Sequence, residues 1–559
     1  MKQRFYIGLL LATVVLVYSN TLWNAFTMDD GLYIVHNPQV TNASVRALFT
    51  PNKISNVFRP FTFVTYALNW AAGGEQPASY HLLNLLLHAG VTCLLYLLLQ
   101  NILAASPYAN IVAFSAALLF AVHPIHTEAV ASIVGRAELL AAGFLLAAWI
   151  MHLQDMEIPA VLCFVLALLS KESAVIFLPL VLVGDYARGK FKSYFRYARI
   201  AAITLLYLGL LWKAQGGHFG TGAVSSMDNP LATIPAGWRI ANALHVAWKY
   251  VGLQFYPATL SCDYSFNQIP VYRDLRHTLP WALAAVAGVG AWIWAVRKRR
   301  SGLVLAGGIY LAGFATTANI LLPTGTIMGE RLAYLPSAGF CLLIALGWNW
   351  LRERQRTLAL AVLAFFAAAL GARTLVRNGD WKNDLALYSA AVRAAPDSAK
   401  MHGNLGNIYV ERGQWELARK ELDAALRIYP QFPDALESYG LLEARLGNYQ
   451  KGGSLMEQAL YTSRRDNPNY DFMAVNLAAV LMQTDHMGRA LELLNREIAE
   501  SPEYARAWSN RAVIHYKRGE MALARADAEV AMRLDPSNRQ TWNLLQILKA
   551  PAASPVSPR

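Results

Sequence analysis

Two adjacent carboxylates, Asp29 and Asp30, follow the first long apolar segment of the chain in the stretch NAFTMDDGLYIVHNP, residues 24–38. A carboxylate can act as a general base that takes a proton from an attacking hydroxyl group. An Asp pair beside Asn and Gly is also typical of a helix cap or a solvated turn. Because no basic residue stands near the pair in sequence, we favour the catalytic interpretation, with Asp30 as the base and Asp29 in support.

Further ionisable residues stand between the later apolar segments, in FAVHPIHTEAVASIVGRAELLA (120–141), LSKESA (170–175) and PTGTIMGERLAYLPS (323–337). Such residues at a membrane face indicate a site rather than a simple anchor. A guanidinium suits a lipid phosphate because its planar fork binds two oxygens at once. The candidate phosphate ligands are Arg331, Arg136 and Lys171, and the candidates for the surrounding donor or acceptor pocket are His123, His126, Glu128, Glu138, Glu330, Arg59 and Asn37.

These residues also have structural interpretations. His123 and His126 could share a helical face, but the sequence offers no convincing third zinc ligand, so we expect no metal. Hydrogen bonding to a lipid headgroup, or packing, explains the pair better. Arg136 could extend its side chain to the membrane interface, and Lys171 could form a local ion pair with Glu172.

The elements that must position these side chains lie largely in lipid. Of 559 residues, 55% are hydrophobic and only 15% are charged, against about a quarter charged in a soluble protein. The net charge of +13 does not indicate a nucleic-acid partner, since many Lys and Arg stand in short loops between apolar segments. The first apolar segment lacks a small-x-small cleavage site before Asn24, which predicts an uncleaved first span. The four cysteines predict no disulfide framework.

A membrane span needs about 20 apolar residues, and basic loops tend to remain in the cytoplasm. With the N-terminus inside, the basic clusters fall in the cytoplasm only if the segment 236–257 lies in the interface without crossing. The acidic pair, the other polar loops and everything after residue 376 then face outside. The eleven predicted spans are 5–23, 80–101, 109–124, 137–153, 157–170, 173–185, 200–214, 278–296, 302–323, 335–351 and 357–376.

Residues 399–538 repeat with a period of 34, in the spacing of tetratricopeptide repeats. Small residues such as Gly406 and Gly440 let the two helices of each repeat pack closely. Such arrays form a concave groove for a peptide or protein. We expect the groove to bind its ligand through residues that include Asn404, Asn407, Tyr439, Asn476 and Asn510.

The sequence thus predicts an all-α protein in four parts. A multi-span domain covers residues 1–376 and a half-repeat linker covers 377–398. The repeats with a capping helix cover 399–550, and a disordered tail covers 551–559.

Together, MDDGLYIVHNP, FAVHPIHTEAVASIVGRAELLA, LSKES, PTGTIMGERLAYLPS and the repeats resemble the transmembrane and tetratricopeptide repeat-containing protein O-mannosyltransferases. The resemblance covers nearly the whole chain and rests on the order and spacing of these segments. The family looks like a branch of the GT-C superfamily of multi-span glycosyltransferases, which use polyprenyl-phosphate sugars.

The resemblance implies that Asp29 or Asp30 deprotonates a Ser or Thr hydroxyl of a protein held by the repeats. The hydroxyl then attacks the sugar with inversion while the lipid phosphate leaves. A dolichyl- or undecaprenyl-phosphate sugar, most naturally mannose, would be the donor, with no cofactor required. The absence of a P-loop or a Rossmann glycine motif from the sequence agrees with a lipid-linked donor.

Two other functions are open at this point: a transferase of the same fold that acts on a lipid or surface glycan, and a non-enzymatic scaffold that assembles membrane complexes through its repeats. An alanine-rich composition without an organelle signal predicts a bacterial inner membrane with the repeats in the periplasm. In a eukaryote, the equivalent location is the endoplasmic reticulum membrane with the repeats in the lumen.

Overall fold

The computed structural model describes residues 2–52, 56–219, 224–463, 467, 469–484 and 486–549. Every regular element in these ranges is a helix, which confirms the predicted all-α class. The chain forms two compact units, Met1–Ser398 and Ala399–Arg559.

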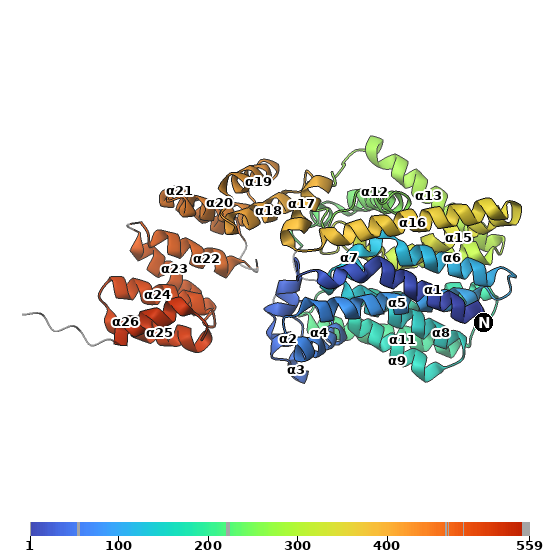
Figure 1. The fold of residues 1–559 in the computed structure, drawn as a ribbon, viewed down its shortest axis with the longest axis horizontal. Helices are drawn as coiled ribbons and strands as arrows, with labels where there is room; N and C mark the ends of the chain where they lie inside the picture. The colour runs from blue at the N-terminus through green and yellow to red at the C-terminus, as the bar shows by residue number, and fades with distance from the viewer. Residues whose placement is uncertain are drawn as a thin grey trace, which may run out of the picture. The chain divides into compact units, whose positions relative to one another are not determined.

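The first unit is a helical bundle. In Figure 1, α1, α5, α6 and α16 lie alongside one another; α1 and α6 each contact the other three helices. The core includes Leu10 of α1, Leu95 of α5 and Phe120 of α6, all almost completely buried. The main helices of the bundle are α1 (Lys2–Tyr18), α5 (Pro77–Ile102), α6 (Ala109–Val122), α8 (Arg136–Leu153), α9 (Glu157–Ser170), α10 (Phe177–Arg188), α11 (Tyr194–Ala214), α12 (Ala236–Phe255), α13 (Leu275–Arg297), α14 (Ser301–Phe314), α15 (Pro336–Arg354) and α16 (Arg356–Asp380).

Shorter elements connect the bundle helices and carry most of the polar segments singled out above. The short α-helices are α2 (Pro38–Thr41), α3 (Val45–Leu48), α4 (Pro60–Gly73), α7 (Thr127–Ala131) and α17 (Asp384–Ala394). The 3-10 helices are η1 (Ser19–Trp23), η3 (Pro124–His126), η4 (Ile133–Gly135), η5 (Glu172–Ile176), η6 (Pro230–Thr233) and η7 (Glu330–Ala333), and the one-turn π-helix is η2 (Gly31–Val35).

Six described helical segments are long and apolar enough to cross a membrane: Lys2–Trp23, Pro77–Ile102, Ile133–Leu153, Tyr194–Ala214, Leu275–Arg297 and Arg356–Asp380. A seventh results if the bent pair Ala109–Val122 and Pro124–Ala131 is one span. The chain is therefore a membrane protein, with six or seven of the eleven predicted crossings supported by length and composition. Among the others, α9 and α14 have 14 residues each, which is about 21 Å of helix and shorter than a bilayer core.

The second unit is a series of paired antiparallel helices, as the period of 34 predicts. Within it, α18 packs on α19, α20 on α21, α22 on α23 and α24 on α25. The pairs are close because glycine faces the partner helix: a Cβ added at Gly406 would lie 2.7 Å from Leu422 Cγ, and one at Gly440 would lie 2.6 Å from Met456 Cγ. The helices are α18 (Ala399–Glu411), α19 (Trp415–Ile428), α20 (Pro433–Arg445), α21 (Tyr449–Thr462), α22 (Tyr470–Leu481), α23 (Met487–Glu500), α24 (Ala505–Lys517), α25 (Met521–Leu534) and α26 (Arg539–Lys549).

A buried carboxylate joins the first helices of successive repeats. Glu437 of α20 is 5% exposed and its Oε1 accepts a hydrogen bond of 2.7 Å from Asn476 Nδ2 of α22. Burial raises the pKa of Glu437 to about 7, although the Asn476 hydrogen bond lowers it. The folded unit therefore binds a proton at Glu437 at a pH where the unfolded chain has released it.

This carboxylate predicts a pH-dependent stability. Because the folded pKa lies above the unfolded one, the contribution of Glu437 is complete below about pH 4.5 and is lost as the pH rises to about 7. Glu437→Gln should leave the unfolding temperature nearly unchanged at pH 5 and raise it by several degrees at pH 8. The free-energy difference is on the order of 3 kcal/mol. Calorimetry of the full chain in detergent measures the unfolding temperature at both pH values. The exposed Glu492→Gln is the control, and an equal effect of Glu437→Gln at both pH values would contradict the prediction.

Candidate functional site

The acidic pair lies in a tight turn after η1. The Asp30 N–H donates to Thr27 O at 3.0 Å, so Met28 and Asp29 are the central residues of a four-residue turn. Met28 has a φ of 50°, in the left-handed region that residues other than glycine seldom occupy. The turn gives the two adjacent carboxylates different surroundings.

Asp30 is fully buried and holds the turn to the bundle. Its Oδ2 accepts the Thr27 N–H at 2.9 Å and its Oδ1 accepts the N–H of Val134 in η4 at 3.0 Å. Burial raises the pKa of Asp30 to about 7, against these backbone hydrogen bonds, which lower it. A carboxylate whose two oxygens both bind backbone donors acts first as a structural link.

Asp29 is only partly buried, and within the described ranges no hydrogen bond or ion pair holds its carboxylate. Its charge acts on Arg331 of η7, which is anchored by Glu128 of α7. Glu128 Oε1 accepts from Arg331 Nη1 at 2.9 Å and Glu128 Oε2 accepts the Arg331 backbone N–H at 2.8 Å. The Arg331 side chain remains 32% exposed. Burial lowers the pKa of Arg331, but the charges of Glu128, Asp29 and Glu138 outweigh it and raise that pKa overall.

Two more ion pairs join α4, α8 and η5 near this position. Arg59 forms a forked pair with Glu172, at 2.9 Å from Nε to Oε2 and 2.6 Å from Nη2 to Oε1. Lys171 Nζ donates to Glu138 Oε1, and both side chains are largely buried. Lys171 could therefore bind a phosphate only by giving up part of its ion pair with Glu138. The charges of Arg59 and Glu138 both act on the pKa of Arg331, and we call these three ion pairs the polar cluster.

Arg136 is differently placed, because its side chain is fully buried. Its Nε donates to Asn84 Oδ1 at 2.9 Å and its Nη1 to Asn69 Oδ1 at 2.7 Å. Its Nη2 donates to Tyr80 O at 3.1 Å, and the guanidinium carbon lies 4.8 Å from the centre of the Tyr66 ring. The guanidinium N–H groups that would bind a phosphate already donate to acceptors within the protein, so the proposed phosphate site does not include Arg136.

Three other predicted pocket residues bind within the protein. His123 Nε2 pairs with Gln254 O at 2.9 Å, and His126 Nε2 pairs with Ser337 Oγ at 2.7 Å. Asn37 caps α2 by accepting the Gln39 N–H. In the part of the chain that the structure describes, no group of three or more His, Cys, Asp or Glu side chains could hold a metal ion.

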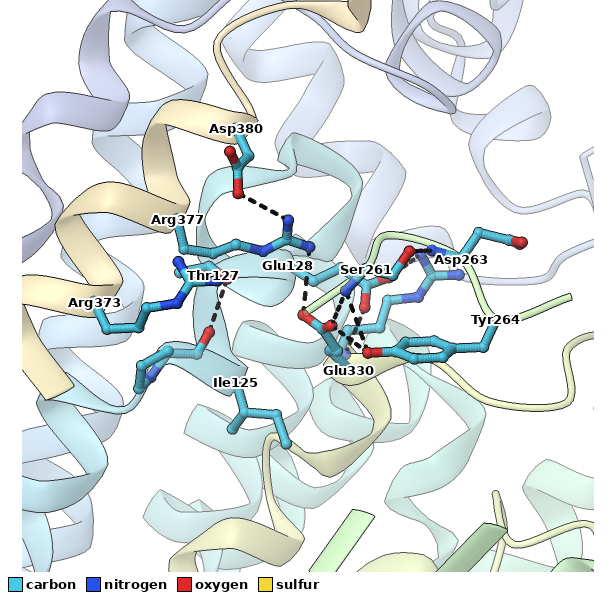
Figure 2. Close-up of polar contacts among 12 residues, drawn as sticks. Ile125, Thr127, Glu128, Ser261, Asp263, Tyr264, Glu330, Arg373, Arg377 and Asp380 are labelled. Carbon is cyan, nitrogen blue, oxygen red and sulfur yellow. Dashed lines mark hydrogen bonds and ion pairs between the residues drawn. The ribbon is translucent and has the colours of Figure 1, made fainter. Parts of the chain in front are cut away.

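A second buried network surrounds Glu330, next to Arg331 in sequence (Figure 2). Glu330 Oε1 accepts from Ser261 N at 2.6 Å and from Tyr264 Oη at 2.7 Å. Its Oε2 lies 3.7 Å from Arg377 Nη2 of α16, and Arg377 Nη1 donates to Asp380 at 3.0 Å. Burial raises the pKa of Glu330 to about 7, while Arg377 lowers it. The network holds the loop after α12 over η7.

Arg377, Asp380 and Tyr264 were not among the residues predicted from the sequence. Arg377 stands near the end of an apolar span, and an ionisable residue in such a place is a signal of a site. Asp380 ends the same segment and carries the same signal, whereas Tyr264 carries no comparable signal in the sequence.

The predicted groove residues of the repeats mostly contact side chains or backbone of their own or the neighbouring repeat. Asn476 binds Glu437 and also accepts from Arg506 Nη2 at 3.1 Å. Asn407 Nδ2 donates to Glu411, and Asn510 Nδ2 donates to Val475 O at 3.4 Å. The Lys451 ammonium lies 5.6 Å from the centre of the Tyr439 ring, and Asn404 is partly exposed.

Comparison with known proteins agrees with this architecture. The tetratricopeptide repeat family model matches residues 370–431, 404–470 and 476–539. The chain is 30% identical over 442 residues to protein O-mannosyl-transferase F38B6.6 of Caenorhabditis elegans, covering 76% of this chain and 63% of the relative. It is 27% identical over 604 residues to protein O-mannosyl-transferase TMTC3 of Homo sapiens, covering 97% of this chain and 65% of the relative.

The predicted resemblance to this family is thus confirmed, while the chain spans less than two thirds of the length of these curated relatives. Among solved structures, the chain is similar to MamA 41-end from Desulfovibrio magneticus RS-1. The identity is 24% and the TM-score 0.24, with 27% of this chain and 82% of that chain covered.

The contrast between Arg136 and Arg331 gives a test of their roles. Arg136→Ala leaves several buried acceptors unpaired, so it should lower the free energy of unfolding by about 3 kcal/mol or more. Arg331→Ala leaves the buried Glu128 without its cation, but the Arg331 backbone N–H still donates to Glu128, so this variant should cost about 1–3 kcal/mol and should also weaken binding of a polyprenyl phosphate. Thermal unfolding and polyprenyl-phosphate binding of both variants in detergent distinguish the two roles. If Arg136→Ala folds normally and weakens binding of a polyprenyl phosphate, Arg136 is a phosphate ligand after all.

Proposed function

We propose that the chain is a membrane glycosyltransferase that moves a hexose, with mannose first, from a polyprenyl phosphate to Ser or Thr hydroxyls of a protein. The single observation that carries the proposal is the partly exposed Arg331, which Glu128 anchors and whose pKa is raised by the charge of the partly exposed Asp29. A base and a cation at one place are the two groups that transfer from a phosphate-linked sugar requires. The names of the relatives support the same activity.

In the proposed mechanism, Asp29 takes the proton of the acceptor hydroxyl as its oxygen attacks the anomeric carbon. The bond from that carbon to the phosphate oxygen breaks, its electron pair stays on the phosphate, and the configuration inverts. Arg331 meets the charge that develops on the leaving phosphate. The proton then passes from Asp29 to water. Lys171 assists only if it is released from Glu138.

The preference for Asp29 over Asp30 as the base comes from the contacts of the two carboxylates. Asp30 is buried with both oxygens occupied by backbone N–H groups, whereas Asp29 is partly exposed and its charge raises the pKa of Arg331. A general base must come within hydrogen-bond reach of the acceptor hydroxyl. Asp30 shapes the turn that carries Asp29.

The repeats are proposed to hold the acceptor polypeptide through the groove that includes Asn404, Tyr439 and Asn510. We further propose that the polar cluster and the repeats face the extracytoplasmic side, with the GT-C arrangement of spans. The basic residues before the first span and after α10, α13 and α15 then lie in the cytoplasm.

Substitution of each carboxylate tests the base. In membranes supplied with polyprenyl-phosphate mannose and an acceptor protein, Asp29→Asn should lower kcat by about 100-fold or more with normal folding. Asp30→Asn should instead lower the unfolding temperature, because an amide replaces one acceptor oxygen with a donor. Asp274→Asn, at an exposed cap of α13, is the control. Full activity of Asp29→Asn would remove this residue from catalysis, and equal transfer by all variants would remove both carboxylates. No transfer by any form, the wild type included, would point to a different donor sugar or to the scaffold function.

Removal of the repeats separates a protein acceptor from a glycan acceptor. A chain that ends at Ser398 keeps the whole first unit and should retain slow hydrolysis of the lipid-linked sugar. Its transfer to protein should fall by at least about tenfold, since the acceptor is no longer held near the site. Donor hydrolysis and protein labelling are measured in the same membranes. Labelling of a surface glycan by both forms would support the glycan-acceptor alternative.

A further inference from the structure

The turn that carries Asp29 is attached to the chain that follows the last span. The Met28 N–H donates to Asp384 Oδ1 at 2.9 Å, and the Ala25 N–H donates to Lys382 O at 2.9 Å. Asn24 Nδ2 donates to Asn378 O at 3.1 Å. Residues 378–384, at the end of α16 and the start of α17, therefore form the surface on which the acidic loop lies.

Asp384 is the first residue of α17, but another residue caps that helix. The N-cap is Asn383, whose Oδ1 accepts the Ala386 N–H at 3.0 Å. The Asp384 carboxylate is thus directed to the backbone of Met28, over 350 residues away in sequence. Helix capping does not account for this contact.

Among residues 24–30, Met28 has a positive φ, and a hydrogen bond from outside the loop can stabilise this conformation. Its φ of 50° lies in the left-handed region, which is unfavourable for a residue with a Cβ. A buried or half-buried N–H that finds a carboxylate gains a strong, charge-assisted hydrogen bond that offsets this cost. The Asp384 acceptor is present at the corner residue itself, directly before Asp29.

We propose that Asp384 is a positioning residue: by accepting the Met28 N–H, it holds the left-handed corner of the turn and so fixes the position of the adjacent Asp29. The inference rests on the proposed function, in which Asp29 is the base. Without the acceptor, the corner relaxes toward negative φ and Asp29 moves with it. A displacement of about 1 Å at a reacting group can lower a rate about 100-fold.

Three variants separate positioning from simple folding. Asp384→Ala removes the acceptor, and we expect kcat to fall about 10- to 100-fold with an unchanged KM for polyprenyl-phosphate mannose. Asp384→Asn keeps an oxygen that accepts the same hydrogen bond, so it should retain most of kcat. Asn383→Ala is the matched control: it loosens α17 by removing its cap but leaves the Met28 contact, and kcat should stay near that of the wild type.

A second-site change tests the backbone argument directly. Glycine adopts positive φ without strain, so Met28→Gly should restore part of kcat in the Asp384→Ala background. No restoration, equal losses in Asp384→Asn and Asp384→Ala, or an equal loss in Asn383→Ala would each overturn the inference.

Hydrogen exchange gives a readout that does not depend on the donor sugar. In the full chain in detergent, the amides of residues 24–30 should exchange faster in Asp384→Ala than in the wild type, and Asn383→Ala should leave them unchanged. If these amides exchange equally in Asp384→Ala and wild type, Asp384 does not hold the turn. If the wild type transfers no mannose while the exchange result holds, the proposed function fails and the role of Asp384 in shaping the loop stands.

Discussion

The polar end of the bundle depends on one constraint: a charge removed from water must have a partner, because the penalty for an unpaired buried charge exceeds most packing energies. Glu128 pairs with Arg331, Glu138 with Lys171 and Glu330 with Arg377. Each pair joins elements far apart in sequence. The positions of the short helices between the spans follow from these pairs as much as from apolar packing.

The same constraint gives two neighbouring residues of one type opposite roles. Asp30 is buried and satisfied by backbone N–H groups, which fixes the turn against η4. Asp29 is left partly exposed near a cation whose other partner, Glu128, is buried. A left-handed corner at Met28 makes this separation compatible with adjacent positions in the chain.

Much of this architecture can be predicted from the sequence because it depends on local patterns. The repeat period predicts the helical pairs, and the polar segments beside Asp29, Glu128 and Arg331 mark residues that the fold brings near one another. Partner identity cannot be predicted in this way. Arg136 can be buried because Asn69 and Asn84 in other helices accept its hydrogen bonds. The contact of Met28 with Asp384 joins residues 356 positions apart in the sequence. Of the eleven predicted crossings, six or seven have the length and composition of a span, because short apolar helices such as α9 and α14 resemble spans in hydropathy but not in length.

The pairing of Arg331 with Glu128 has a consequence for the proposed reaction. A polyprenyl-phosphate sugar is a phosphodiester with one negative charge, and the phosphate released from it is a monoester that approaches two charges near neutral pH. The charge on the phosphate therefore grows as the bond to the sugar breaks. A cation such as Arg331 therefore gains more from the leaving group than from the donor, and interactions that strengthen in the transition state raise kcat. In the proposed reaction, Glu128 orients Arg331 for this role through its contacts with the Arg331 backbone and side chain.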